Sequence, residues 1–156
     1  MNEITLSSTQ YLSQKGIPFK IIHLKEVPKT ALDIERLYGC SIKQVLKTLV
    51  FVTESIPLIV VIQGHKKVDP DKLKHHAGVS TLRLAKADEV FTITGYMPGA
   101  VSPFGIKSSV QKIIDSAVFT EKSVNIGSGA AATGLELTTP DLKQIWDGTV
   151  ADVSCA

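Results

Sequence analysis

Residues 45–62 decide how this chain folds, and they read VLKTLVFVTESIPLIVVI. Two runs within this stretch, residues 46–52 and residues 58–62, are rich in β-branched and large apolar side chains, which favour strands. Residues 54–57 (ESIP) lie between them and have the polar and proline content of a turn. We therefore predict that the two runs form adjacent central strands of a β-hairpin.

The sequence on either side of this hairpin consists of short elements separated by single glycines and prolines. Capping residues and apolar periodicity predict helices over about residues 8–16, 30–39, 70–77, 87–94 and 140–146. Further apolar runs predict short strands at residues 19–24, 110–114, 118–119, 124–126, 135–138 and 150–153. Because no βαβ spacing repeats, we predict one α+β domain over residues 1–156, with a mixed, mainly antiparallel curled sheet and flanking helices.

The charged residues and cysteines limit the class of protein. The net charge of +2 is too small to indicate a nucleic-acid binder by charge alone, and only Arg36 and Arg83 are arginines. Cys40 and Cys155 lie far apart with no zinc-ligand spacing, which fits a reducing cytosol and predicts neither metal nor disulfide. The first twelve residues lack an apolar signal segment and no apolar run is long enough for a bilayer, so we expect a cytoplasmic protein without a membrane partner.

Lys47 is the first candidate for chemistry, because it interrupts a run that otherwise belongs to a sheet. Lysine is almost never fully buried without a partner, so this side chain must reach a cleft, a carboxylate or an anionic ligand. The alternative is a lysine whose amine extends from the strand edge into solvent.

Two small-residue loops are the next candidates. Residues 95–105 (GYMPGAVSPFG) hold three glycines and two prolines, a composition that lets a ligand approach the backbone and its amides closely. Residues 127–134 (GSGAAATG) match neither a Walker motif nor a dinucleotide fingerprint. Each loop has a purely structural alternative as a tight turn between regular elements.

The histidines do not indicate a hydrolytic triad, because none of His23, His65, His75 and His76 stands beside a signature serine or cysteine. Residues 65–76 form the most basic stretch, in which His65, Lys66, Lys67, Lys72, Lys74, His75 and His76 are interrupted by two aspartates. Such a stretch is either a solvated face or a phosphate-contacting surface.

The order of these features resembles the YbaK/ProX family, freestanding relatives of the editing domain of bacterial prolyl-tRNA synthetase. The resemblance is carried by residues 45–51 (VLKTLVF), by residues 94–105, by the Gly-Ser-Gly loop that runs into residues 134–137 (GLEL), and by residues 140–142 (PDL). It implies a cytoplasmic hydrolase that removes a wrongly attached amino acid, typically alanine or cysteine, from the 3′ end of proline tRNA. It implies no cofactor, tRNA as the partner, and a synthetase as a possible second partner.

The resemblance also implies roles for individual residues. Lys47 is the expected catalytic pocket residue, and the substrate-binding residues are Thr30, Gly99, Ala100, Val101, Ser102, Pro103, Gly127, Ser128 and Gly129. Many relatives have a second glycine where this chain has Ala100, so its methyl group is expected to affect the size of the accepted amino acid. The loop over residues 127–134 lacks a basic residue that several relatives carry there.

Two further hypotheses stay open at this point: a module that binds the tRNA end or a nucleotide without turnover, and a catalytically silent partner of a synthetase. The absence of a triad is compatible with hydrolysis, because an aminoacyl ester is an activated bond. A site need only hold the ester against water, polarise its carbonyl and neutralise nearby negative charge, with a ribose hydroxyl assisting.

Overall fold

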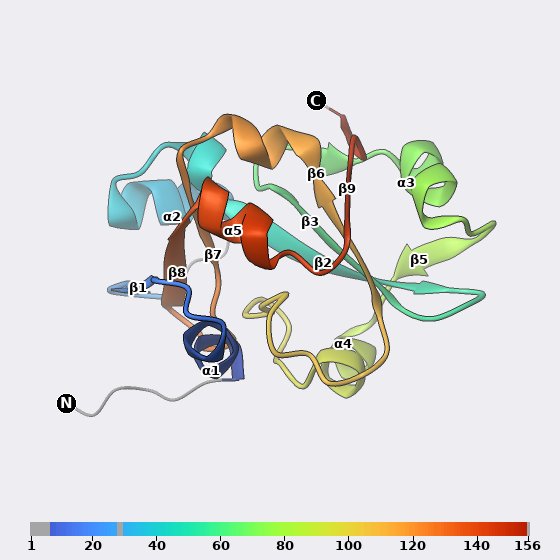
Figure 1. Cartoon of the computed structure of the whole chain (residues 1–156), viewed down its shortest axis with the longest axis horizontal. Coiled ribbons are helices and arrows are strands. Elements are labelled where there is room, and N and C mark those ends of the chain that lie inside the picture. The colour runs from blue at the N-terminus through green and yellow to red at the C-terminus, as the bar shows by residue number, and fades with distance from the viewer. Residues whose placement is uncertain (1–6, 28–29, 156) are drawn as a thin grey trace.

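Two sheets lying side by side form the frame of the molecule in a computed structural model that describes residues 7–27 and 30–155 (Figure 1). The larger sheet has five strands in the order β5-β2-β3-β6-β9, and the smaller has three in the order β1-β8-β7. The larger sheet consists of β5 (Leu82–Leu84), β2 (Leu46–Thr53), β3 (Leu58–Gln63), β6 (Gln111–Asp115) and β9 (Thr149–Ala151). The smaller sheet consists of β1 (Lys20–His23), β8 (Thr133–Thr138) and β7 (Ser123–Gly127).

The predicted hairpin is confirmed. β2 and β3 pair antiparallel from Leu46 opposite Gln63 to Phe51 opposite Leu58. Every residue of β3 is buried, because this strand lies in the middle of the sheet with a hydrophobic cluster on each face. Val61 packs into one cluster while its neighbours Val60 and Ile62 pack into another, as the alternation of side chains along a strand requires.

The pairing is mixed and mainly antiparallel, which confirms the predicted α+β class. The parallel pairs are β3 with β6 and β6 with β9, whereas β2 with β5, β1 with β8 and β7 with β8 are antiparallel. A two-residue ladder between β4 (Lys67–Val68) and β10 (Ser154–Cys155) is also antiparallel. β4, β5 and β10 were not predicted, because strands of two or three residues are too short for periodicity to show.

The helices flank the sheets and begin and end at the predicted signals. They are α1 (Ser7–Gln14), α2 (Ala31–Tyr38), α3 (Pro70–Ala77), α4 (Ala87–Thr94) and α5 (Thr139–Ile145). Thr30 caps α2 by accepting a hydrogen bond from the amide of Asp33, and Asp69 caps α3. In Figure 1, α3 lies above β5 at the upper right, α4 lies below the larger sheet, and α1 lies below the smaller sheet. None of the helices in the described segments has the length and apolar character needed to cross a bilayer.

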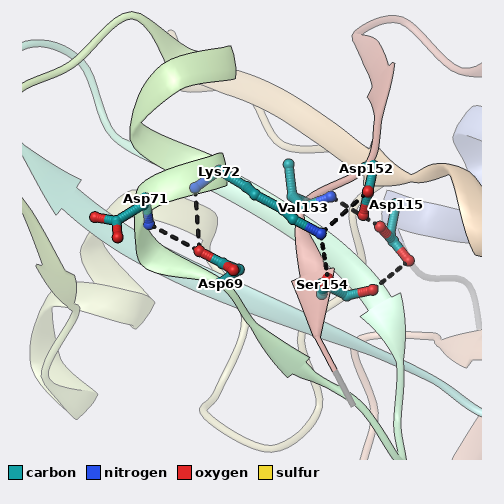
Figure 2. A network of polar contacts seen from close by, with 7 residues as sticks. All are labelled: Asp69, Asp71, Lys72, Asp115, Asp152, Val153 and Ser154. Atoms are coloured by element: carbon teal, nitrogen blue, oxygen red, sulfur yellow. Dashed lines mark hydrogen bonds and ion pairs between the residues drawn. The ribbon is translucent and has the colours of Figure 1, made fainter.

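Two predicted strands are wrong in detail. Residues 118–119 belong to a 3-10 helix, η2 (Ser116–Thr120), in which Val118 is buried without any strand partner. The predicted strand over residues 150–153 ends at Ala151, because the residues beyond it form hydrogen bonds with the side chain of Asp115 instead of with a strand. The Asp115 carboxylate accepts hydrogen bonds from the amide of Val153 (3.0 Å) and the hydroxyl of Ser154 (2.8 Å), as Figure 2 shows.

Candidate functional site

A cavity of about 930 Å³ opens between the two sheets. It is bordered by β1, by the start of α2, by β2, by the loop after α4 and by the chain from β7 to β8. Its volume is in the range of ligand pockets, roughly 300–1,000 Å³. Its lining among the described residues includes no aspartate or glutamate, and Lys47 is the charged side chain that borders it.

The cavity runs along residues 46–49 of β2, whose edge on that side pairs with no other strand of the described residues. β5 pairs only with residues 51–53 of β2, and the carbonyl of Val50 accepts a hydrogen bond from Ala85 just before that ladder. Towards the other end, a single bridge joins Val45 to Asn125 of β7. Between these contacts, residues 46–49 of β2 border the cavity.

Lys47 lies on this edge, opposite Ile62 of β3. Its side chain is half-buried, and this burial, followed by the positive charge of Lys67, lowers the pKa of its amine. No carboxylate of the described residues forms an ion pair with Lys47. A desolvated amine without a counter-ion beside a cavity is suited to an anionic or strongly polar ligand.

The loop after α4 contributes Gly99, Ala100 and Val101 to the same cavity as Lys47. Ala100 and Val101 are buried, and the amides of Gly99 and Val101 donate no hydrogen bond to the described residues. Ser102 and Pro103 are buried behind the cavity wall and do not border it. The Ser102 hydroxyl accepts a hydrogen bond from the amide of Phe104 (3.2 Å), so it holds the shape of the loop.

The glycine-rich loop between β7 and β8 packs directly on the first loop. A methyl group on Gly127 would overlap the carbonyl oxygen of Val101, and one on Gly129 would overlap the ring of Tyr96. Gly127 and Gly129 border the cavity, whereas Ser128 is fully buried. The Ser128 hydroxyl donates to the carbonyl of Thr133 (2.6 Å), so this residue also holds its loop rather than facing the cavity.

The remaining wall is mainly apolar. Ile22 and Leu24 from the β1 segment and Ile34 from α2 border the cavity opposite β2. Thr30 also borders it, but its hydroxyl oxygen accepts the α2 capping bond. The structure therefore brings together Lys47, Thr30, Gly99, Ala100, Val101, Gly127 and Gly129 at one cavity, and places Ser102, Pro103 and Ser128 behind its wall.

Sequence reasoning missed two polar residues of this lining. Asn125 is buried, and its amide donates to the sulfur of Cys40 (3.1 Å). Thr48 borders the cavity with a buried hydroxyl oxygen that has no hydrogen-bond partner among the described residues. The sequence signal for Thr48 was present, because it is a polar residue inside an apolar strand, directly after Lys47.

The basic stretch over residues 65–76 divides into two parts. Lys72, on α3, forms an ion pair with Asp152 (3.1 Å), as Figure 2 shows. Lys66 and Lys67 follow Gly64, which borders the cavity, and neither forms an ion pair with a described residue. The half of the stretch nearest the cavity therefore keeps unneutralised positive charge.

Comparisons with known proteins match this chain to an aminoacyl-tRNA editing domain over residues 25–145. The proline–tRNA ligase of Citrifermentans bemidjiense is 32% identical over 108 residues, which are 69% of this chain and 19% of the ligase. The chain thus spans about a fifth of the length of the curated relatives that it matches.

Two solved structures cover nearly the whole chain. A hypothetical protein, APE2540, is 27% identical with a TM-score of 0.88, over 96% of this chain and 99% of its own. A candidate trans-editing enzyme for prolyl-tRNA synthetase has the same TM-score at 24% identity, over 99% of this chain and 100% of its own, and shows the likeness of fold.

Proposed function

The chain belongs to the aminoacyl-tRNA editing domain family, and from this membership we propose that it is a trans-editing deacylase that hydrolyses the ester of a mischarged tRNA. The proposed substrate carries a small amino acid, such as alanine or cysteine, on proline tRNA. One observation carries the proposal: Lys47, residues 99–101 and the glycine loop, which are far apart in the sequence, border one cavity of suitable size.

The proposed chemistry needs no side-chain nucleophile. A water oxygen attacks the ester carbonyl carbon, the bond to the ribose oxygen breaks, and that oxygen receives a proton, which yields free amino acid and tRNA. The amides of Gly99 and Val101 are available to polarise the carbonyl, and Lys47 to neutralise developing or nearby negative charge. A neighbouring ribose hydroxyl of the substrate assists the proton transfer.

The proposed partner is the 3′ end of tRNA. Among the described residues, the cavity lining contains no carboxylate, and Lys66 and Lys67, which follow the lining residue Gly64, form no ion pair. These surroundings favour a polyanion over a cation. The proposal includes cytoplasmic action on tRNA by a single domain over residues 1–156, with or without a synthetase.

A deacylation assay tests the proposal. Proline tRNA charged with alanine, serine, cysteine or proline is incubated with the purified chain, and the remaining aminoacyl ester is measured against a sample without protein. We expect hydrolysis of the alanyl ester first, then the seryl or cysteinyl ester, in preference to the prolyl ester. Binding of these tRNAs without turnover would contradict a deacylase and favour the binding module.

A further inference from the structure

Asn125, on β7, uses one half of its side-chain amide within the fold and leaves the other half free. Its Nδ2 donates to the sulfur of Cys40 (3.1 Å), whereas its Oδ1 accepts no hydrogen bond from the described residues. Among these residues, the side-chain polar atom that is both fully buried and without a partner is Thr48 Oγ1, so Asn125 Oδ1 keeps some accessible surface. Because Asn125 is otherwise buried and borders the cavity, this oxygen opens into the cavity.

The charges around Asn125 favour this orientation of the amide. Burial, followed by the charges of Glu35 and Glu136, raises the pKa of the Cys40 thiol, so both carboxylates lie near that side of the amide. Lys47 borders the cavity, towards which the amide oxygen points. An NH₂ group is attracted to carboxylates and an oxygen to a cation, which agrees with the hydrogen bond from Nδ2 to Cys40.

Lys47 and Asn125 lie on the same face of their two strands. The bridge between Val45 and Asn125 makes β7 the parallel neighbour of β2 at this point, so these two side chains share a face. Lys47 is two residues further along β2 and therefore shares that face as well. Beyond the bridge the two strands no longer pair, and the cavity borders both of them. A ligand there meets a donor at Lys47 and an acceptor at Asn125.

The free oxygen also lies near the loop amides. Gly127 follows Asn125 by two residues, about 6.6 Å along a strand, and Gly127 packs against the carbonyl of Val101. In an aminoacyl ester, the α-amino group and the carbonyl oxygen are attached to neighbouring carbons. With a hydrogen bond of about 2.9 Å at each end, the two groups span a separation of this size.

The α-amino group is the part of an aminoacyl ester that needs acceptors, and no carboxylate of the described residues borders the cavity. The main chain supplies one acceptor beside Asn125. Since the amide of Gly64 donates to the carbonyl of Val45, the alternation of an antiparallel ladder turns the carbonyl of Thr48 away from β3, towards the open edge of β2. An amino group has several N–H donors and can use both oxygens, of which a substitution can remove that of Asn125.

We propose that Asn125 Oδ1 accepts a hydrogen bond from the α-amino group of the bound aminoacyl ester and so directs the ester carbonyl towards Lys47 and the loop amides. Asn125 thereby selects acyl groups that carry an α-amino substituent. This inference rests on the proposed function and deepens it, because it assigns recognition of the amino group to a named atom.

The test compares two substitutions that each replace an amide by an apolar side chain of similar size. Asn125→Leu removes the free oxygen from the cavity. Gln44→Met is the matched control, because the Gln44 amide donates to Ser123 of the same strand (3.2 Å) but does not border the cavity. Both variants lose a hydrogen bond, and only Asn125→Leu should change the choice of substrate.

Two esters on the same tRNA separate this role from others. For the alanyl ester we expect Asn125→Leu to lower kcat/KM about 10- to 100-fold, the range for a hydrogen bond to a charged group. For the propionyl ester, which lacks the amino group, wild type and Asn125→Leu should react equally. Asn125→Asp should keep the preference for the alanyl ester, because an acceptor oxygen faces the cavity whichever way the carboxylate turns. Gln44→Met should keep the wild-type ratio of the two rates.

Four results would overturn the inference: an unchanged rate of Asn125→Leu on the alanyl ester, equal losses on both esters, loss of the preference in Asn125→Asp, or the same shift of the ratio in Gln44→Met. If the wild type hydrolyses neither ester, the proposed function itself fails and this inference fails with it. Hydrolysis of both esters by the wild type without discrimination would overturn only the role of Asn125.

Discussion

Lys47 lies on the edge of a mainly apolar strand and forms no ion pair with any carboxylate of the described residues. Lys47→Ala removes this charge but little core volume, so the variant should stay folded. We expect it to lose most deacylation of the alanyl ester, measured as kcat/KM after circular dichroism has shown an unchanged fold. Full activity with unchanged substrate affinity would contradict the role of Lys47.

The same side chain also predicts a pH dependence of stability. Burial lowers the pKa of Lys47 below the 10.5 of the unfolded chain, so between these two values the unfolded state binds more protons. Stability from this group therefore rises with pH through that window. Relative to Lys47→Met, the wild type should be less stable at neutral pH, and urea titrations should show the difference shrinking as the pH approaches 10.5.

Ala100 borders the cavity, and we expect its methyl group to narrow the space for the amino acid. It is buried within the loop that borders the site, beside Gly99 and Val101. Discrimination by one methyl group in an apolar pocket is limited to about 1–3 kcal/mol, so Ala100→Gly should broaden acceptance of bulkier amino acids by about 10- to 200-fold at most. The measurement is the ratio of rates for an alanyl and a bulkier ester on one tRNA. An unchanged ratio in an active variant would mean that Ala100 faces away from the substrate.

The loop after α4 and the loop between β7 and β8 pack closely against each other, so the shape of each loop depends on the other. Gly127 has no room for a methyl group, since the Val101 carbonyl occupies that position, whereas a methyl group on Gly134 would meet only the Ile126 carbonyl at 3.7 Å. Neither glycine has a positive φ, so the two substitutions differ in packing alone. Gly127→Ala should cost about 1–3 kcal/mol of unfolding free energy and reduce deacylation.

Gly134→Ala is the matched control from the other end of the same loop, and its stability should stay within about 0.5 kcal/mol of wild type. Urea denaturation of both variants gives the comparison. Equal costs for the two alanines would show that the loops do not depend on this close approach.

The elements also show how far sequence reasoning reaches. The β2–β3 hairpin and the α3 cap at Asp69 were predictable because a long apolar run and an Asp-Pro pair are local signals. The end of β9 was not predictable, because it depends on a hydrogen bond from the amide of Val153 to Asp115, which is far away in the sequence. The same limit applies to the site: loop composition pointed to residues 99–103, but only packing shows that Ser102 faces inward.

At the scale of the whole molecule, positive and negative charges nearly balance, so a surface for an anion can be recognised only from how the charges are distributed. The net charge is +2, and Lys72, Arg83 and Lys112 are neutralised by ion pairs with Asp152, Glu89 and Asp147. Lys66 and Lys67 have no such partner among the described residues and follow Gly64 at the cavity. We therefore expect the phosphates of a tRNA whose 3′ end enters the cavity to contact these two lysines.

This placement predicts a change in salt dependence. Each phosphate contact contributes a slope of about −0.7 to −0.9 in a plot of log affinity against log salt concentration. Lys66→Gln/Lys67→Gln should therefore weaken tRNA binding at low salt and make the slope less steep by about 1.5. The control, Lys107→Gln/Lys143→Gln, removes the same charge from exposed lysines that do not border the cavity, and it should leave the slope unchanged. Filter binding between about 50 and 200 mM salt measures both slopes. Equal changes in the two double variants would mean that tRNA responds to net charge, whereas a change confined to the first places the phosphates beside Gly64.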